Sequence, residues 1–192
     1  MPEDRRNVTE KAWIEPPPKL TGPITFAEYD PAWPSLYERE EARIRSILGD
    51  RVIRIEHTGS TSVPGLAAKP TIDVTMTVAD VTDEPAFVDD LVAAGYRLVI
   101  REREPDWWDH CVLGGPDTKI NLHVFSAGCT ELDRMVGFRD WLRTHDDDRA
   151  LYEATKRELI SREWTYVQEY ADQKTAVVEA IAARARLPAR HP

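Results

Sequence analysis

The sequence predicts an α+β domain in which a β-sheet is followed by a helical C-terminal layer. Two observations predict this class. Strand-like segments alternate with helical ones as far as residue 125, and segments with helical spacing alone fill most of the remainder. The length of 192 residues suits one domain with a sizeable core, or one domain with an arm. We therefore expect a single folding unit whose sheet packs against helices.

Residues 1–22 are predicted to form a flexible N-terminal arm. The prolines at 16–18 and 23 cannot donate backbone hydrogen bonds, and they favour extended polyproline geometry. The domain is expected to occupy residues 23–187, and residues 188–192 are expected to form a short tail.

Strands and helices are mixed between the arm and residue 125. Short β-rich segments with alternating apolar residues indicate strands, and Gly49 and Gly95 are natural helix ends. In the segment 71–78, Val74 and its alternate neighbours are apolar, whereas Asp73 and Thr75 lie on the opposite, polar face. The expected strands are 24–28, 52–57, 71–78, 96–101, 108–113 and 119–125, and the expected helices are 30–48 and 84–95.

The last third of the chain is predicted to form three helices. Thr130 is a suitable N-cap for the first, and Asp133 in its first turn suits the helix dipole. The second contains two acidic–basic pairs at i, i+4, which stabilise a helix surface. The expected helices are 130–145, 146–162 and 164–187.

The charge balance argues against nucleic-acid binding. The chain has 25 Lys+Arg against 34 Asp+Glu, a net charge of −9, and basic residues are interleaved with acidic ones. A duplex binder usually carries a basic stripe, because phosphate neutralisation dominates its affinity. A small anionic substrate is still compatible with this charge, since a local pocket can be positive inside an acidic protein.

The sequence also predicts a cytoplasmic protein that does not span a membrane. No apolar run approaches the ~18 residues that a span requires, and the N-terminal residues contain no apolar signal core. Cys111 and Cys129 are too few for a disulfide framework or a zinc knuckle.

A turn rich in small residues follows the predicted strand 52–57 and is the first candidate for chemistry. Gly59 would let a phosphate approach the backbone closely. Ser60, Thr61 and Ser62 offer hydroxyl and amide donors for an anion. The alternative is that this segment is only a loop between two strands.

Two charged residues follow the turn. Lys69 could neutralise an anion, and Asp73 on the polar face of the next strand could hold a divalent cation that bridges phosphates. The alternative for Asp73 is a solvated or hydrogen-bonded carboxylate with no ligand.

Histidines near this segment are further candidates. His123 shares one strand face with Asn121 and could be a metal ligand or a general base, or else a histidine hydrogen-bonded within the sheet. Glu56 and His57 lie on opposite faces of their strand, and we expect His57 to face the pocket because it is nearer the turn.

Three basic residues on the C-terminal helices could reach a phosphate across a cleft. They are Arg139, Lys156 and Lys174. The alternative is that each forms a surface ion pair worth under about 1 kcal/mol.

The run IEHTGSTSVPGLAAKPTIDV at 55–74 resembles the signature of the GrpB family. Further segments resemble that family in the same order, among them YDPAWPSLYERE, EPDWWDHCVL, NLHVFSAG, FRDWLRTH and YEATKREL. The resemblance covers roughly residues 24–182 and includes the segments that contain Lys156 and Lys174. It implies a nucleotidyltransferase-like fold with a mixed β-sheet, because GrpB proteins are grouped with that superfamily.

The resemblance also implies roles for individual residues. The superfamily pattern is a Gly-Ser turn, about a dozen residues, and then two carboxylates two residues apart on a strand. Gly59 and Ser60 match the turn that contacts a triphosphate, and Asp73 matches the first carboxylate that holds Mg²⁺. The second position is Thr75, a neutral hydroxyl, and a two-metal site needs several anionic oxygens. This departure argues against ordinary two-metal transfer.

The first functional hypothesis is a domain that binds a small-molecule nucleotide or phosphorylated metabolite with Mg²⁺ and transfers a nucleotidyl or phosphoryl group. Asp73 and His123 would be the catalytic pair. One alternative is a non-catalytic binding or regulatory module, linked to coenzyme A metabolism through GrpB-like domains fused to dephospho-CoA kinase. Another is a metal-dependent hydrolase or ligase that uses His57, His123 and Asp73.

Overall fold

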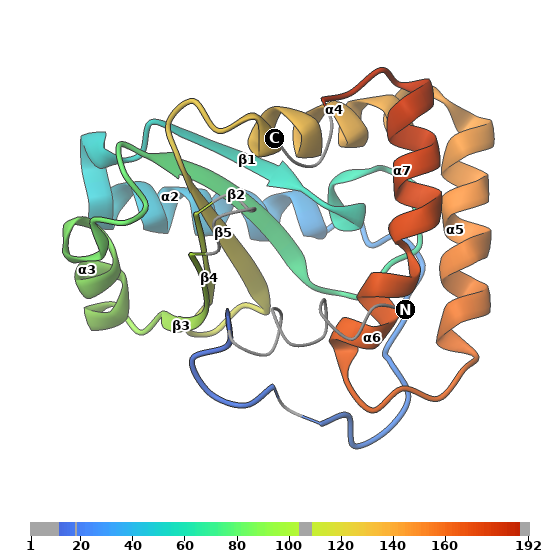
Figure 1. Cartoon of the computed structure of the whole chain (residues 1–192), viewed down its shortest axis with the longest axis horizontal. Coiled ribbons are helices and arrows are strands. Elements are labelled where there is room, and N and C mark those ends of the chain that lie inside the picture. The colour runs from blue at the N-terminus through green and yellow to red at the C-terminus, as the bar shows by residue number, and fades with distance from the viewer. Residues whose placement is uncertain (1–11, 18, 104–108, 189–192) are drawn as a thin grey trace.

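A five-stranded mixed sheet forms the centre of the computed structural model, which describes residues 12–17, 19–103 and 109–188 (Figure 1). The strand order is β1-β2-β5-β4-β3, in which β2 and β5 are parallel and the other neighbours are antiparallel. The α+β class and the mixed sheet predicted from the sequence are therefore confirmed. The strands are β1 Arg54–Thr58, β2 Ile72–Val78, β3 Arg97–Glu102, β4 His110–Gly114 and β5 Ile120–Ser126.

Helices lie on both faces and at one end of this sheet. Figure 1 shows α2 crossing the sheet, α4 above β1, and α5 and α7 side by side at one end. The helices are α2 Trp33–Leu48, α3 Val88–Ala93, α4 Thr130–Thr144, α5 Asp146–Ile160, α6 Val167–Gln173 and α7 Thr175–Arg184. Three short 3₁₀ segments are η1 Gly49–Arg51, η2 Ser60–Ser62 and η3 Glu84–Ala86.

The main core lies between the sheet and the helices α2 and α3. Val74 and Met76 of β2 are fully buried there with Ile44 of α2 and Leu91 of α3. Alternation along β2 places these apolar residues on one face, so that Asp73 and its alternate neighbours occupy the other face. The site described below lies on this second face.

A second core joins the helical layer to the turn after β1. Val63 and Leu66, which follow η2, are fully buried against Leu142 of α4, Tyr152 of α5 and Ile181 of α7. Burial of this apolar surface holds the C-terminal helices against the turn. The helical layer and the turn are consequently one packed unit.

Several element boundaries differ from those predicted. Residues 24–28 form no strand, since only Ala27 makes a bridge, to Ala68. The segment 84–95 divides into η3 and α3, because Phe87 has an extended φ of −147°. The N-cap of α4 is Cys129 rather than Thr130. The start of the predicted strand 108–113 lies outside the described residues.

The predicted helix 164–187 is in fact two helices. Tyr166 and Glu169 form a capping box at the start of α6, and Lys174 separates α6 from α7. The chain therefore turns beside Lys174, which places this residue at the junction of the two helices.

The described part of the predicted arm contacts the domain at two places. The N–H of Ile14 donates to the carbonyl of Val99 at 3.0 Å, at the outer edge of β3. The N–H of Leu20 donates to the carbonyl of Thr165 at 2.9 Å. No helix in the described ranges is long and apolar enough to cross a membrane.

Replacing Leu66 by alanine should lower the free energy of unfolding by about 2–5 kcal/mol, because the change leaves a cavity in the second core. Urea denaturation measures this loss. The matched control is Leu151→Ala on α5, where the side chain is 47% exposed and the loss should be below about 1 kcal/mol. Equal losses in the two variants would show that Leu66 does not hold the helical layer.

Candidate functional site

The backbone of Gly59 and the carboxylate of Asp73 lie against each other at the end of β1. Gly59 has φ +66° and leads from β1 into η2. A Cβ atom built on Gly59 would lie 2.1 Å from Oδ2 of Asp73, which is closer than any real contact allows. Only glycine therefore permits this approach, for reasons of both φ and space. The structure thus brings together the turn and the aspartate that the sequence singled out.

A neighbouring strand orients the Asp73 carboxylate. Asn121 of β5 is the register partner of Asp73 on β2, and its Nδ2 donates to Oδ1 of Asp73 at 2.9 Å. This bond fixes one oxygen of the carboxylate, while the other oxygen lies against Gly59.

Lys156 of α5 brings a buried positive charge to the turn. Its side chain is 1% exposed, and Nζ donates to Oγ of Ser60 at 3.2 Å and to the carbonyl of Ala67 at 2.5 Å. Burial lowers the pKa of Lys156 to about 7, and the positive charge of Lys174 acts in the same direction, whereas Glu153 opposes the shift. The amino group of Lys156 that contacts Ser60 is therefore only partly protonated at neutral pH.

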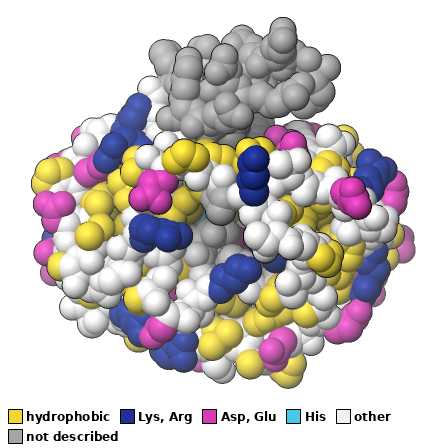
Figure 2. All heavy atoms as spheres, turned by 90° about the horizontal axis from the view of Figure 1, so that it is seen from below, with side chains coloured by type: hydrophobic (Ala, Val, Ile, Leu, Met, Phe, Trp, Pro, Cys, Tyr) yellow, Lys and Arg dark blue, Asp and Glu magenta, His cyan; other side chains and the backbone are white. Residues whose placement is uncertain are grey.

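Two further lysines add positive charge. The pKa of Lys69 is lowered by burial and by the positive charges of Lys174 and Lys119, while the nearby Asp73 opposes the shift. The Nζ atom of Lys174 lies 4.7 Å from the ring centroid of Tyr170. Figure 2 shows several Lys and Arg side chains around the hollowed middle of the face that it views.

The hydroxyls of Thr61 and Ser62 are used inside the turn. Thr61 is buried, and its Oγ1 lies 3.0 Å from Nε2 of His57 and donates to the carbonyl of Thr71 at 3.3 Å. Ser62 Oγ donates to the carbonyl of Gly59 at 2.6 Å. The expectation that both hydroxyls donate to a phosphate does not agree with this arrangement, because each donor is already engaged by a backbone carbonyl.

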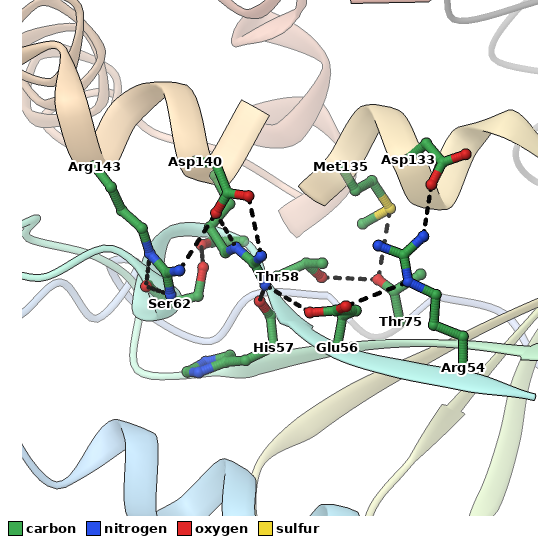
Figure 3. Close-up of polar contacts among 12 residues, drawn as sticks. Arg54, Glu56, His57, Thr58, Ser62, Thr75, Asp133, Met135, Asp140 and Arg143 are labelled. Atoms are coloured by element: carbon green, nitrogen blue, oxygen red, sulfur yellow. Dashed lines mark hydrogen bonds and ion pairs between the residues drawn. The ribbon is translucent and has the colours of Figure 1, made fainter. Parts of the chain in front are cut away.

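Two arginines of α4 hold the backbone on either side of the turn. Arg139 donates to the carbonyl of His57 and to Glu56, both at 2.9 Å. Arg143 donates to the carbonyl of Ser62 at 2.7 and 3.1 Å (Figure 3). Arg139 therefore positions the turn in this structure. Sequence analysis missed Arg143, although its place four residues after Arg139 puts both on one helix face.

Thr75 occupies the position where a second carboxylate was sought, and it is fully buried. Its Oγ1 lies 2.7 Å from Oγ1 of Thr58 and 3.6 Å from Sδ of Met135 (Figure 3). Across the described parts of the chain, no three His, Cys, Asp or Glu side chains converge as a metal site would require. The donor set around Asp73 therefore does not fit a pair of magnesium ions, which needs several anionic oxygens.

His123 of β5 belongs to a chain of three hydrogen-bonded side chains. Its Nδ1 lies 3.1 Å from Nε2 of His110, and Nδ1 of His110 lies 2.9 Å from Oε2 of Glu102. Burial and the neighbouring His110 lower the pKa of His123 to about 4, while Asp73 and Glu102 oppose the shift. His123 is therefore neutral at physiological pH. Sequence analysis missed Glu102 and His110.

His57 points away from Asp73, contrary to the expectation. Figure 3 shows the ring on the side of β1 opposite α4. It is buried and stacked on Tyr37 of α2 with ring centroids 4.8 Å apart. Burial lowers the pKa of His57 to about 4. Strand alternation instead places Glu56 on the α4 side, where it pairs with arginines.

A cavity of about 270 Å³ adjoins the turn. Gly59 and Ser60 form part of its wall, and Lys174 and Phe138 line it from the helical layer together with Tyr152. The cavity therefore offers a hydroxyl, a cation and aromatic surface next to the glycine.

Comparison with known proteins identifies the family. The sequence model described as GrpB protein matches residues 23–184. The chain belongs to the GrpB family. It is 56% identical over 162 residues to the UPF0157 protein BH1888 of Halalkalibacterium halodurans, covering 84% of this chain and 82% of that one. It is 44% identical to the UPF0157 protein SCO7215 of Streptomyces coelicolor, covering 84% of each chain.

Among solved structures, this GrpB chain is similar to the conserved protein GrpB from Enterococcus faecalis. The TM-score is 0.68 at 27% identity, covering 84% of this chain and 96% of the other. A weaker likeness, with a TM-score of 0.49 at 12% identity, is to the Cid1 poly(U) polymerase, covering 71% of this chain and 45% of that one. The GrpB family and the α+β fold with a mixed sheet expected from the sequence are thus confirmed.

The free energy of unfolding should rise between pH 7 and 9.5, and Lys156 should account for part of the rise. Folding lowers the pKa of Lys156 from 10.5 to about 7, so the unfolded state binds more protons in this window. Stability increases with pH wherever the unfolded state binds more protons, here by on the order of 3 kcal/mol at most.

Urea denaturation of Lys156→Met at pH 7, 8 and 9.5 tests this assignment. The variant should show a flatter dependence on pH than the wild type, and Arg45→Met, at an exposed ion pair on α2, should keep the wild-type slope. If the free energy of unfolding changed with pH by the same slope in wild type and Lys156→Met, the assignment to Lys156 would be wrong.

Proposed function

We propose that this domain binds the phosphate groups of a nucleotide or phosphorylated metabolite at the turn formed by Gly59 and Ser60. The observation that carries the proposal is the buried ammonium of Lys156 behind the hydroxyl of Ser60. The positive charge of Lys156 is disfavoured by burial in the absence of an anion. A phosphate at Ser60 would stabilise the protonated lysine, so binding of the anion and protonation of the lysine support each other.

The rest of such a ligand would occupy the adjoining cavity. Its volume of about 270 Å³ lies just below the range for small-molecule sites, about 300–1,000 Å³, and suits a small ligand. Phe138 and Tyr152 provide aromatic surface for a base, and Lys174 provides a cation that can contact a phosphate directly.

In this proposal Asp73 holds a single divalent cation that also contacts the phosphates. Gly59 allows the carboxylate to reach the turn, and Asn121 keeps it oriented. A divalent cation would neutralise phosphate charge when bound. Transfer of a nucleotidyl or phosphoryl group is the activity that this placement favours, with the neutral His123 beside Asp73 on the same face.

A second candidate is a binding or regulatory module without catalysis. The fully buried, neutral Thr75 in place of a second carboxylate favours it. A protein named dephospho-CoA kinase from Mycolicibacterium paratuberculosis is 30% identical over 164 residues, which cover 40% of that protein. A ligand related to coenzyme A is therefore included below. A hydrolase that uses His57 with His123 and Asp73 has no support, because His57 lies on the other face.

Titration calorimetry with ATP, GTP, CTP and dephospho-coenzyme A, with and without Mg²⁺, tests the proposal. We expect one of these compounds to bind, and Lys156→Met to weaken that binding by about 10-fold or more, as expected for a lost charged partner. The control is Arg45→Met, at an exposed ion pair on α2, which should bind as the wild type does.

Absence of binding by the whole panel, or equal binding by wild type and Lys156→Met, would overturn the proposal. Tight binding of one compound without turnover of any would favour the module over the transferase. Binding that depends on Mg²⁺ in the wild type but not in Asp73→Ala would support the metal role of Asp73.

A further inference from the structure

The hydrogen-bonded chain from Glu102 through His110 to His123 fixes the position of His123 and also determines which of its ring nitrogens carries the proton. The two imidazole rings are parallel, at an interplanar angle of 0°, with centroids 5.3 Å apart and nitrogens 3.1 Å apart. Side-by-side parallel rings suit a bond in which an N–H in the plane of one ring meets the lone pair of the other. The ring of His110 also stacks on Phe125 with centroids 4.4 Å apart, which holds the arrangement in place.

The carboxylate at one end determines where the protons lie. An ionised carboxylate only accepts, so Nδ1 of His110 carries a proton and donates to Glu102. A neutral imidazole has one donor and one acceptor, so Nε2 of His110 accepts. Nδ1 of His123 must then donate to it. The remaining nitrogen of His123, Nε2, then carries a lone pair, and no hydrogen bond to this atom is found among the described residues.

The lone pair belongs to a side chain on the same face of the sheet as Asp73. β2 and β5 are parallel neighbours, with Asp73 opposite Asn121 and Thr75 opposite His123. Paired residues on adjacent strands share a face, as do residues two apart on one strand. The carboxylate and the imidazole therefore project from diagonal positions on adjacent strands, and Asn121 between them orients the carboxylate.

We propose that Nε2 of His123 and the carboxylate of Asp73 are the two protein ligands of one divalent cation that accepts a nitrogen ligand more readily than Mg²⁺ does, such as Co²⁺ or Zn²⁺. Imidazole suits such ions, whereas Mg²⁺ takes oxygen ligands. A ligating histidine usually donates its other N–H to a carboxylate or a similar acceptor, which fixes its tautomer. The Glu102–His110 pair supplies that support through a second imidazole.

This inference shares Asp73 with the proposed function but needs no nucleotide. Two protein ligands leave positions for water or for phosphate oxygens, so the cation alone should bind weakly. Asn121 would hold Asp73 in place through its hydrogen bond and would not supply a charged ligand to the cation. Glu102 and His110 are positioning residues, because they act through His123.

Titration of the full chain with Co²⁺, followed by calorimetry and by visible absorption, tests the site. We expect one Co²⁺ per chain that a hundredfold excess of Mg²⁺ does not displace. His123→Ala should abolish this binding. His110→Phe keeps a ring against Phe125 and should weaken binding by about 10–100-fold, the usual effect of losing a supporting partner. The matched control is His145→Gln, a histidine on the helical layer, which should bind as the wild type does.

A second measurement does not depend on metal binding. Nitrogen-15 NMR of histidine-labelled protein without metal should show the proton of His123 on Nδ1, and in His110→Phe the proton should move largely to Nε2. A wild-type proton on Nε2, no Co²⁺ binding, or equal loss in His145→Gln and His123→Ala would overturn the inference. Nucleotide binding without Co²⁺ binding would defeat this inference alone, and Co²⁺ binding without any nucleotide binding would defeat the proposed function alone.

Discussion

The close approach of a glycine backbone to a carboxylate is the constraint on which the rest of the site depends. Gly59 can accept Asp73 only because it has no side chain and because its φ of +66° is one that other residues rarely adopt. The turn and the aspartate come from segments separated by a loop, and the antiparallel pairing of β1 with β2 brings them together. Any side chain at Gly59 would displace the carboxylate.

The helical layer and the sheet build this site jointly. The second core around Leu66 attaches α4, α5 and α7 to the segment that leaves the turn. The same helices then supply Arg139 and Arg143 to the backbone carbonyls of the turn, and Lys156 to Ser60. The packing that stabilises the fold therefore also determines which positively charged side chains lie beside the turn. This coupling explains why a buried lysine, costly in itself, occurs at this position.

The sequence predicted those features that depend on local periodicity. Alternation in the segment 71–78 placed Asp73 and Thr75 on the polar face, because a strand has only two faces. The turn rich in small residues was also predicted. Its nearness to Asp73 was predicted as well, partly from the family resemblance. The break beside Lys174 was missed because helical spacing continues through it, and periodicity alone does not reveal a change of direction.

Features that depend on register and tertiary packing could not be predicted. Glu102 and His110 support His123 only because β3, β4 and β5 pair in one particular register, which includes an irregularity between Leu98 and Ile100. The side to which His57 points depends on where β1 ends. Lys156 lies in a helix whose charged pattern suggested an exposed surface, and only the packing of α5 against the turn buries it.

The pKa of Lys156, measured by NMR of its labelled side chain with and without inorganic tripolyphosphate, tests the central claim most directly. The account predicts a pKa near 7 in the free protein and a clear rise when the anion binds beside Ser60. An ordinary pKa in the free protein, or a lowered one that saturating tripolyphosphate leaves unchanged, would contradict the account.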